Sequence, residues 1–221
     1  MQIAILLYDN ITVLDAVGPF QTLSSLPDAE VVFVAEQAGP VLDDTRTLSL
    51  VATKSLAEVS SPDIVVVPGS PEPDLRNEAV LNWLRAVDAT TTWTTSVCTG
   101  SLILAAAGLL KGRRATSHWL ALEQIKQFGV ESTGQRVVFD GKYVTGAGVS
   151  AGIDMGLTLA GKIAGDEHAQ TVQLLIEYDP QPPYDAGSPD KAPAALVERF
   201  RTQTAQAAAQ TAARTAAPTV S

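Results

Sequence analysis

The stretch TTWTTSVCTGSLILAAAGLLKG, residues 91–112, decides the fold of this chain. Its first part is rich in threonine, valine and tryptophan, which favour strands, and its second part is an alanine- and leucine-rich run that predicts a helix ending at Gly112. The two parts meet at Cys98 with no linker between them. In open α/β folds, the side chain at such a turn projects from the carboxyl end of the sheet, where ligands bind.

The rest of the chain alternates in the same way. Apolar runs at residues 2–8, 30–35 and 64–67 predict buried strands, and helical spacing of apolar residues follows the candidate caps Thr12 and Asn77. Further elements are predicted as a helix at 118–128, a hairpin at 136–146 with its turn at Asp140 and Gly141, and helices at 150–164 and 167–177. This order predicts a doubly wound α/β fold with a mostly parallel sheet and helices on both faces.

Composition limits the classes of function. The chain has 221 residues, of which 46% are hydrophobic, and 24 acidic against 15 basic side chains give a net charge of −9. Nucleic-acid binding is therefore not expected, because it requires a surface that neutralises phosphates. One cysteine and two histidines provide almost nothing for a zinc or iron site, so no metal is predicted. With no signal peptide and no apolar run of membrane-spanning length, we expect a cytoplasmic protein without membrane contacts.

The junction at Cys98 is the best candidate for chemistry. The N–H groups of Thr99 and Gly100 begin the helix without partners, so they can stabilise a thiolate and then an anion formed on a substrate. Gly100 also lets the backbone approach closely. The plain alternative is that Cys98 is a small buried hydrophobic residue and that Thr99 only caps the helix. The strand–turn–helix context favours the nucleophile.

Other candidates for the site come from elsewhere in the sequence. A nucleophilic cysteine usually has a histidine helper, and His118 is the candidate whose role stays open, whereas a surface or packing role is favoured for His168. The segment GAGVSAG, residues 146–152, predicts a strand-to-helix turn in which Gly148 either lines the pocket or serves close packing.

Five segments together resemble the DJ-1/PfpI superfamily, and more narrowly its isonitrile (isocyanide) hydratases. They are LDAVGPF (14–20), VVVPGS (65–70), SVCTGSLILAAAGLLKGRRATSHW (96–119), VTGAGVSAGIDMGL (144–157) and EYDPQPPYDAGSPD (177–190). The resemblance extends from about residue 2 to about residue 195. It implies a flavodoxin-like single domain over residues 1–195, usually a homodimer. No cofactor is expected, because the chain shows no cofactor motif. An alanine-, threonine- and glutamine-rich tail, 196–221, is expected to be a frayed helix or disordered.

The resemblance also implies roles for individual residues. Asp15, at the position of the family's acidic residue in the first helix, is expected to reach Cys98; without the resemblance it would be interpreted as an exposed helix acid. The family often has Gly-Gly after the third strand, but here Gly69 is followed by Ser70 and Pro71, which changes the predicted anion pocket. Thr99 replaces the histidine that follows the cysteine in the peptidase-like branch, so proteolysis is not expected.

The predicted function is therefore hydration of an isocyanide to an N-substituted formamide, with Cys98 as nucleophile, Asp15 as proton shuttle and Thr99 as an orienting group. Gly69, Ser70, Gly100, His118 and Gly148 are predicted to contact the small-molecule substrate. Alternatives are a cysteine-based sensor of oxidative stress, a glyoxalase-like enzyme and, with less support, the ligand-binding domain of a transcription regulator.

Overall fold

The computed structural model describes the backbone of residues 1–216 and the side chains of residues 1–206, so residues 217–221 of the predicted tail lie outside the described residues. The chain forms two compact units, one of which is Met1–Tyr178 and the other of which begins at Asp179. The second unit is irregular until α7, which runs from Ala194 to Ala216. Of the two expectations for the tail, a helix or disorder, the described part up to Ala216 is a helix. The predicted boundary at residue 195 stays a prediction, and the division between the units falls earlier, after Tyr178.

A seven-stranded sheet organises the first unit in the order β10-β11-β7-β6-β1-β2-β5. All neighbours in it are parallel except β10 and β11, so the predicted flavodoxin-like, mostly parallel fold is confirmed. The strands are β1 Gln2–Leu6, β2 Glu30–Ala35, β5 Lys54–Ser55, β6 Ile64–Val67, β7 Trp93–Val97, β10 Val137–Asp140 and β11 Tyr143–Gly146. The strand order reverses between β1 and β6, and the carboxyl ends of strands at such a switch point form the usual ligand crevice.

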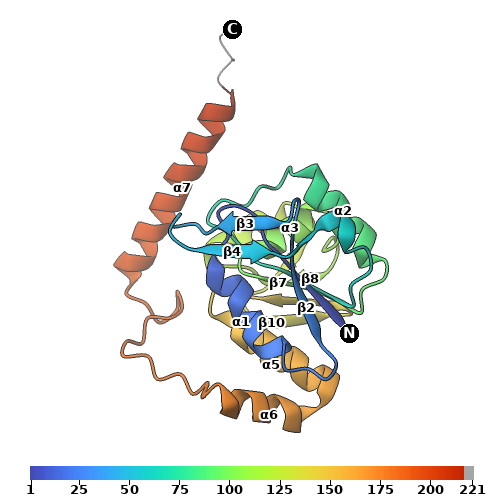
Figure 1. Cartoon of the computed structure of the whole chain (residues 1–221). Helices are drawn as coiled ribbons and strands as arrows, with labels where there is room; N and C mark the ends of the chain where they lie inside the picture. Colours follow the sequence, from blue (N-terminus) through green and yellow to red (C-terminus); the bar gives the residue numbers. More distant parts are fainter. Residues whose placement is uncertain (217–221) are drawn as a thin grey trace. The chain divides into compact units, whose positions relative to one another are not determined.

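Helices cover both faces of the sheet, as Figure 1 shows. Side chains alternate along β1, so that Ile3 and Ile5 join the core under α1 and α5, while Ala4 and Leu6 join the core under α2, α3 and α4. The helices are α1 Val13–Leu23, α2 Glu78–Asp88, α3 Gly100–Ala106, α4 Leu122–Lys126, α5 Ala151–Ala164 and α6 Asp166–Leu175. Helix α1 packs closely on α5, because a Cβ on Gly156 would lie 1.9 Å from Thr22 Oγ1.

The predicted starts of two helices are confirmed. Helix α2 begins after Asn77, whose side chain accepts a hydrogen bond from Val80 N at 3.2 Å, as expected of an N-cap. Helix α1 begins after Thr12, but the Thr12 hydroxyl donates to Asp44 Oδ2 at 3.0 Å instead of capping the helix.

Three local predictions need correction. Helix α3 ends at Ala106, not at Gly112, because Gly108 adopts φ +85° and ends the helix earlier. Asp140 pairs with Tyr143, so the two hairpin turn residues are Gly141 and Lys142, one position later than predicted. The helix predicted at 118–128 is a 3₁₀ turn, Trp119–Ala121, followed by the short helix α4.

Two small sheets were not predicted. Strands β3 Gly39–Leu42 and β4 Ser49–Ala52 form an antiparallel pair, and β8 Arg114–Ala115 pairs with β9 Glu131–Ser132. The loop between β3 and β4 is held by Asp43, whose Oδ1 accepts from both Thr47 N and Leu48 N at 3.0 Å.

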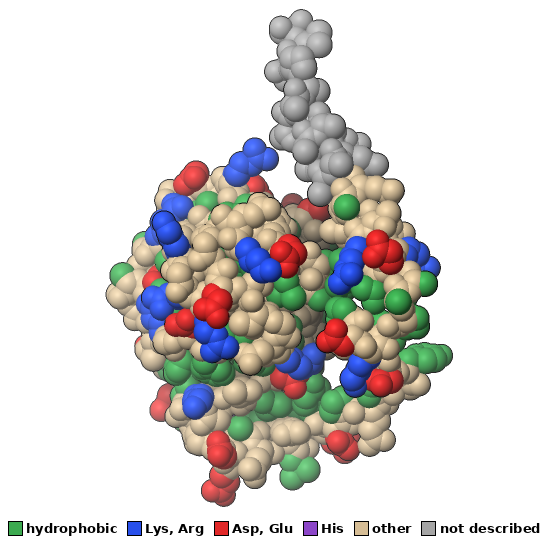
Figure 2. Space-filling model, turned by 180° about the vertical axis from the view of Figure 1, so that it is seen from behind, with side chains coloured by type: hydrophobic (Ala, Val, Ile, Leu, Met, Phe, Trp, Pro, Cys, Tyr) green, Lys and Arg blue, Asp and Glu red, His purple; other side chains and the backbone are tan. Residues whose placement is uncertain are grey.

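The surface carries charges of both signs. Figure 2 shows acidic and basic side chains interspersed with hydrophobic ones on the face that it presents. Among the described residues, no helix combines the length and the apolar character needed to cross a bilayer.

Candidate active site

Cys98 occupies the tight turn between β7 and α3, with a φ of +58°. This left-handed conformation is unfavourable for a residue with a Cβ and is found where the surroundings enforce it, often at active sites. The Cys98 N–H donates to Ala147 O at 2.7 Å, and its carbonyl accepts from Ser101 Oγ at 3.0 Å and Ser117 Oγ at 3.1 Å. Hydrogen bonds to both sides of the residue therefore fix the predicted turn.

Gly100 has a packing role that the sequence predicted only in outline. A Cβ on Gly100 would lie 2.0 Å from Val67 O and 2.7 Å from Pro68 O, so the first turn of α3 presses directly on the carboxyl end of β6. Any side chain here would push the turn away from the sheet. Contact between Gly100 and a substrate stays a prediction.

Asp15 lies in the first turn of α1 and is fully buried, so the interpretation as an exposed helix acid does not apply. Its Oδ2 accepts from Gly69 N at 2.8 Å. Its Oδ1 has no hydrogen-bond partner among the described residues. Burial raises the pKa of this carboxyl to about 7, although the Gly69 N–H and the Cys98 thiol partly offset burial; the charge of Asp44 raises the pKa further.

The Cys98 thiol is also buried, with 5% of the residue exposed. Burial, together with the charge of Asp15, raises the pKa of the thiol to about 12, while the N–H groups of Thr99 and Val149 lower it. The amide groups therefore do not keep the resting sulfur ionised by themselves. Because Asp15 and Cys98 influence each other, they titrate as a pair, and the pair holds one proton between about pH 7 and pH 12.

Thr99 does not cap α3 with its side chain. Its hydroxyl donates to Ser70 O at 2.6 Å and accepts from Ser70 N at 2.8 Å. This pair of hydrogen bonds joins the loop after β6 to the turn at Cys98. The Thr99 hydroxyl therefore orients this loop, and orientation of a substrate by Thr99 stays a prediction. The N–H of Ser70 is used in this contact, and Pro71 has none, so neither is a free donor for a substrate anion.

Gly69 lies between Asp15 and Thr99. A Cβ at this position would lie 2.6 Å from Thr99 Oγ1 and 2.8 Å from Asp15 Oδ2, so only glycine fits. Ser70 is 1% exposed, and its Oγ accepts from Glu72 N at 3.1 Å. Both residues shape the wall of the site, and direct contact of either with a substrate stays a prediction.

His118 and Gly148 lie together, since a Cβ on Gly148 would be 3.0 Å from His118 Cδ2. His118 Nδ1 accepts from Leu120 N at 3.4 Å, and burial lowers the pKa of the ring, which is therefore neutral at pH 7. The residue before Gly148 in the chain, Ala147, accepts the Cys98 N–H. The structure thus places Gly148 beside the turn, with His118 packed against it.

Two groups at the site could not be found from the sequence. The Val149 N–H acts on the Cys98 sulfur from the turn before α5, where only Gly148 had been singled out. Tyr8, at the carboxyl end of the first predicted strand, donates its hydroxyl to Pro68 O at 2.7 Å. Burial raises the pKa of Tyr8, as do the charges of Asp15 and Cys98, so its hydroxyl stays protonated near the pair.

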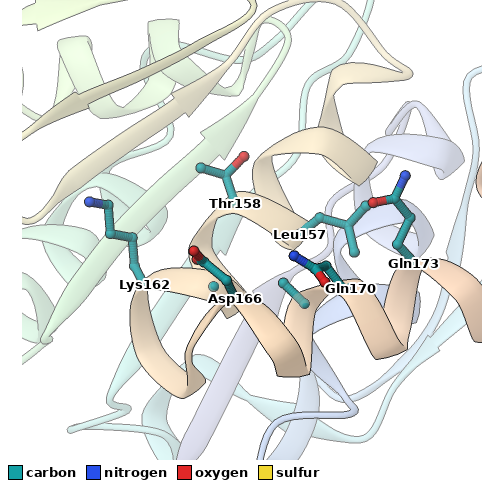
Figure 3. Close-up of a pocket in the computed structure, with 8 residues that line it drawn as sticks. Leu157, Thr158, Lys162, Asp166, Gln170 and Gln173 are labelled. Carbon is teal, nitrogen blue, oxygen red and sulfur yellow. The ribbon is translucent and has the colours of Figure 1, made fainter.

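A separate hollow of about 490 Å³ lies between α5 and α6 and includes none of the predicted site residues (Figure 3). Thr158, Lys162, Asp166, Gln170 and Gln173 provide its polar lining. Within the described part of the chain, no group of three or more histidine, cysteine, aspartate or glutamate side chains is arranged to hold a metal ion.

The sequence and the structure of the chain are similar to those of several known proteins. The chain is 43% identical to the isonitrile hydratase of Pseudomonas putida, with 93% of this chain and 90% of that protein covered. It is 39% identical to a THiJ/PfpI family protein from Pseudomonas syringae, whose crystal structure superposes with a TM-score of 0.89 over 93% of this chain and 86% of that one. It is also 34% identical to the HTH-type transcriptional regulator CdhR of Pseudomonas aeruginosa, over 63% of this chain and 42% of that protein.

The family assignment rests on more than these pairs. The sequence profile of the DJ-1/PfpI family matches residues 1–162, which include Asp15, Cys98 and every strand of the main sheet. This chain belongs to the DJ-1/PfpI family.

Proposed function

We propose that this protein hydrates isocyanides to N-substituted formamides, with Cys98 as the nucleophile. The observation that carries the proposal is that Oδ1 of a fully buried Asp15, next to the chain's one cysteine, has no hydrogen-bond partner in the part of the chain that the structure describes. A buried carboxyl oxygen without a partner is unfavourable for stability, so its presence beside a thiol points to chemistry. The 43% identity to an isonitrile hydratase supports this reaction.

The first half of the proposed reaction uses the single proton of the pair. In R–N≡C the terminal carbon accepts a nucleophile, and a proton must be added to the substrate. Asp15 takes the proton of Cys98 as the sulfur attacks that carbon, and then delivers it to the same carbon. The product of this half is a thioimidate, R–N=CH–S–Cys98, and Asp15 is again ionised.

The second half adds water. Ionised Asp15 removes a proton from a water molecule that attacks the thioimidate carbon, and this proton passes to the nitrogen. The C–S bond then breaks, Cys98 recovers a proton from the new hydroxyl group by way of Asp15, and R–NH–CHO leaves. Overall, R–N≡C and water combine to give R–NH–CHO, and no electrons are transferred. The N–H groups of Thr99 and Val149 face the sulfur and stabilise its charge while the C–S bond forms and breaks.

The test is a formamide assay on purified protein with small aliphatic and aromatic isocyanides. We expect wild-type turnover, and Cys98→Ala is expected to lower it by about 10³-fold or more. Formamide production by Cys98→Ala at a near wild-type rate would refute the mechanism. The same protein is assayed with methylglyoxal, because turnover of the dicarbonyl alone would favour a glyoxalase-like function.

A redox-sensor function has less support. Such a sensor needs an exposed thiolate with a low pKa, whereas Cys98 is buried and its pKa is raised. A stable sulfinate at Cys98 in a protein that leaves every isocyanide unchanged would favour the sensor.

We also propose that the protein is a homodimer and that it is located in the cytoplasm. Size-exclusion chromatography with light scattering tests the homodimer.

A further inference from the structure

One peptide group connects two side chains at the site. Tyr8 Oη donates to the carbonyl of Pro68 at 2.7 Å, and the N–H of the same peptide bond, on Gly69, donates to Asp15 Oδ2 at 2.8 Å. Tyr8 follows β1 and Asp15 lies in α1, so the peptide after β6 links a side chain at the end of a strand to one inside a helix. A hydrogen bond accepted by a carbonyl polarises its peptide group and makes the N–H a stronger donor.

We propose that Tyr8 is a positioning residue that strengthens the Gly69 hydrogen bond to Asp15 through the Pro68–Gly69 peptide. This inference rests on the proposed function only where it predicts an effect of Tyr8 on isocyanide turnover. It adds a third proton-bearing side chain to the site, one that touches neither the sulfur nor the carboxylate in a hydrogen bond. Its part is to favour the ionised form of Asp15, which takes the thiol proton.

The surroundings of the peptide support a specific role. On the far side of Gly69, its carbonyl accepts the Thr12 N–H at 2.9 Å, so the glycine is held from β6, α1 and the loop before α1 at once. A shift of the peptide to find another donor would strain or break this contact and the Gly69 hydrogen bond to Asp15. Pro68 O therefore has no easy replacement for the Tyr8 hydroxyl.

The charged and titratable groups around Asp15 come from three elements. Cys98 lowers the pKa of Asp15 from the turn before α3, and Asp44 raises it from the β3–β4 loop. Tyr8 lies after the end of β1, where the charge of Asp15 raises the pKa of the Tyr8 hydroxyl. Helix α5 contacts α1 through Gly152, Ile153 and Gly156, which are not titratable. A change at Tyr8 alone leaves Cys98 and Asp44 in place.

The direct experiment is ¹³C NMR titration of protein labelled at aspartate carboxyls, with Asp15 assigned by Asp15→Asn. In Tyr8→Phe the ring still packs on the core, but the polarising hydroxyl is lost. We expect the titration midpoint of Asp15 to rise from about 7 by about half a pH unit. Tyr143→Phe is the matched control, since it also removes a tyrosine hydroxyl bonded to an oxygen, that of Asp88, and should leave the Asp15 midpoint unchanged.

A kinetic experiment separates this role from a structural one. With isocyanide as substrate, Tyr8→Phe should shift the acidic limb of the kcat/KM profile by the same half unit, a loss of about threefold below the midpoint, with an unchanged plateau. A lower plateau with an unmoved limb would mean that Tyr8 only supports the loop. An unchanged Asp15 midpoint in the NMR titration would overturn the inference.

Two further results keep the outcomes distinct. Replacing tyrosine with 3-fluorotyrosine, a stronger donor, should lower the Asp15 midpoint in wild type, and this arm tests the inference without the Tyr8→Phe variant. In folded Tyr8→Phe the same replacement should have no effect. The NMR titration needs no isocyanide. A protein that turns over no isocyanide but shows the shifted midpoint would refute the proposed function and support the role of Tyr8.

Discussion

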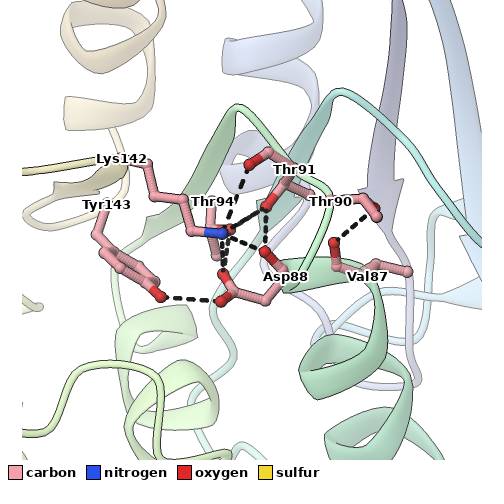
Figure 4. Close-up of polar contacts among 7 residues, drawn as sticks. All are labelled: Val87, Asp88, Thr90, Thr91, Thr94, Lys142 and Tyr143. Carbon is pink, nitrogen blue, oxygen red and sulfur yellow. Dashed lines mark hydrogen bonds and ion pairs between the residues drawn. The ribbon is translucent and has the colours of Figure 1, made fainter.

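Two carboxylates near opposite ends of β7 show how differently one fold can treat the same group. Near the amino end, Asp88 accepts from Thr94 Oγ1 at 2.7 Å and Tyr143 Oη at 2.9 Å and forms an ion pair with Lys142 at 3.3 Å (Figure 4). At the carboxyl end, Asp15 has a single hydrogen bond, to Gly69 N, and one oxygen without a partner among the described residues. The satisfied carboxylate belongs to the scaffold, whereas the unsatisfied one is available for proton transfer.

The surroundings explain the difference. Lys142 is the second residue of the hairpin turn and also donates to Asp88 O and to Thr91 Oγ1, so a cation and several hydroxyls surround Asp88. No cation is among the groups that shift the pKa of Asp15, and its nearest titratable neighbours are a thiol, a phenol and another carboxylate. Burial is the largest cause of the raised pKa of Asp15, and no cation among these groups offsets it.

The largest expected effect comes from Asp15→Asn. The amide keeps the acceptor for Gly69 N but cannot shuttle a proton, so kcat/KM for isocyanide hydration should fall by about 10²- to 10⁴-fold. Because folding raises the pKa of Asp15 from 3.8 to about 7, wild-type stability should decline as pH rises through that range. The variant, which has no carboxyl to ionise, should be more stable than wild type at pH 8 and similar at pH 4. Urea unfolding at both pH values measures this, and a variant that is less stable at pH 8 would contradict the comparison.

Asp88→Ala should do the reverse. It removes three partners and leaves Lys142 partly buried without its carboxylate, so the free energy of unfolding should fall by about 3 kcal/mol, while kcat/KM of the folded protein stays the same. Glu78→Ala on the same helix is the control, because its carboxylate is 72% exposed and its ion pair with Arg85 should contribute little. A large loss of kcat/KM in folded Asp88→Ala would show that the two ends are coupled.

The pH dependence gives the smallest effect, about tenfold per pH unit. Below about pH 7 the Asp15–Cys98 pair holds two protons and Asp15 cannot accept the one on sulfur, so kcat/KM should rise with pH and level off above about 7. Stopped assays in overlapping buffers measure the limb. A profile that falls between pH 6 and 8 would contradict the assignment of Asp15 as the initial acceptor.

The scaffold could be predicted from local patterns to a large extent. Buried runs such as EVVFVA, residues 30–35, match β2 in full, because a strand covered on both faces needs a continuous apolar sequence. The end of α3 was misplaced because Gly108 and Gly112 lie in the same run, and both adopt a positive φ. Which of them ends the helix depends on tertiary packing. Strands β3 and β4 are short, and a start at Gly39 and Pro40 is more typical of a loop.

The site could be predicted only in part. The turn at Cys98 follows from the junction of a strand with a helix, but nothing in sequence spacing brings Asp15 to Cys98, and that expectation came from the resemblance. The hydroxyl of Thr99 was expected near the sulfur or as a cap, yet its main partners are the backbone groups of Ser70. Tyr8 was missed because its role depends on a peptide sixty residues away in sequence. Long-range contacts of this kind leave no periodic trace.

The backbone angle of Cys98 has an evolutionary consequence. Glycine adopts a φ of +58° without the cost of about 1–3 kcal/mol that a side chain brings, so selection for stability alone would favour glycine at residue 98. A descendant of this chain released from its chemistry would gain stability by that replacement. We therefore expect glycine at this turn in related sequences that keep the fold but lack the chemistry proposed here for Cys98.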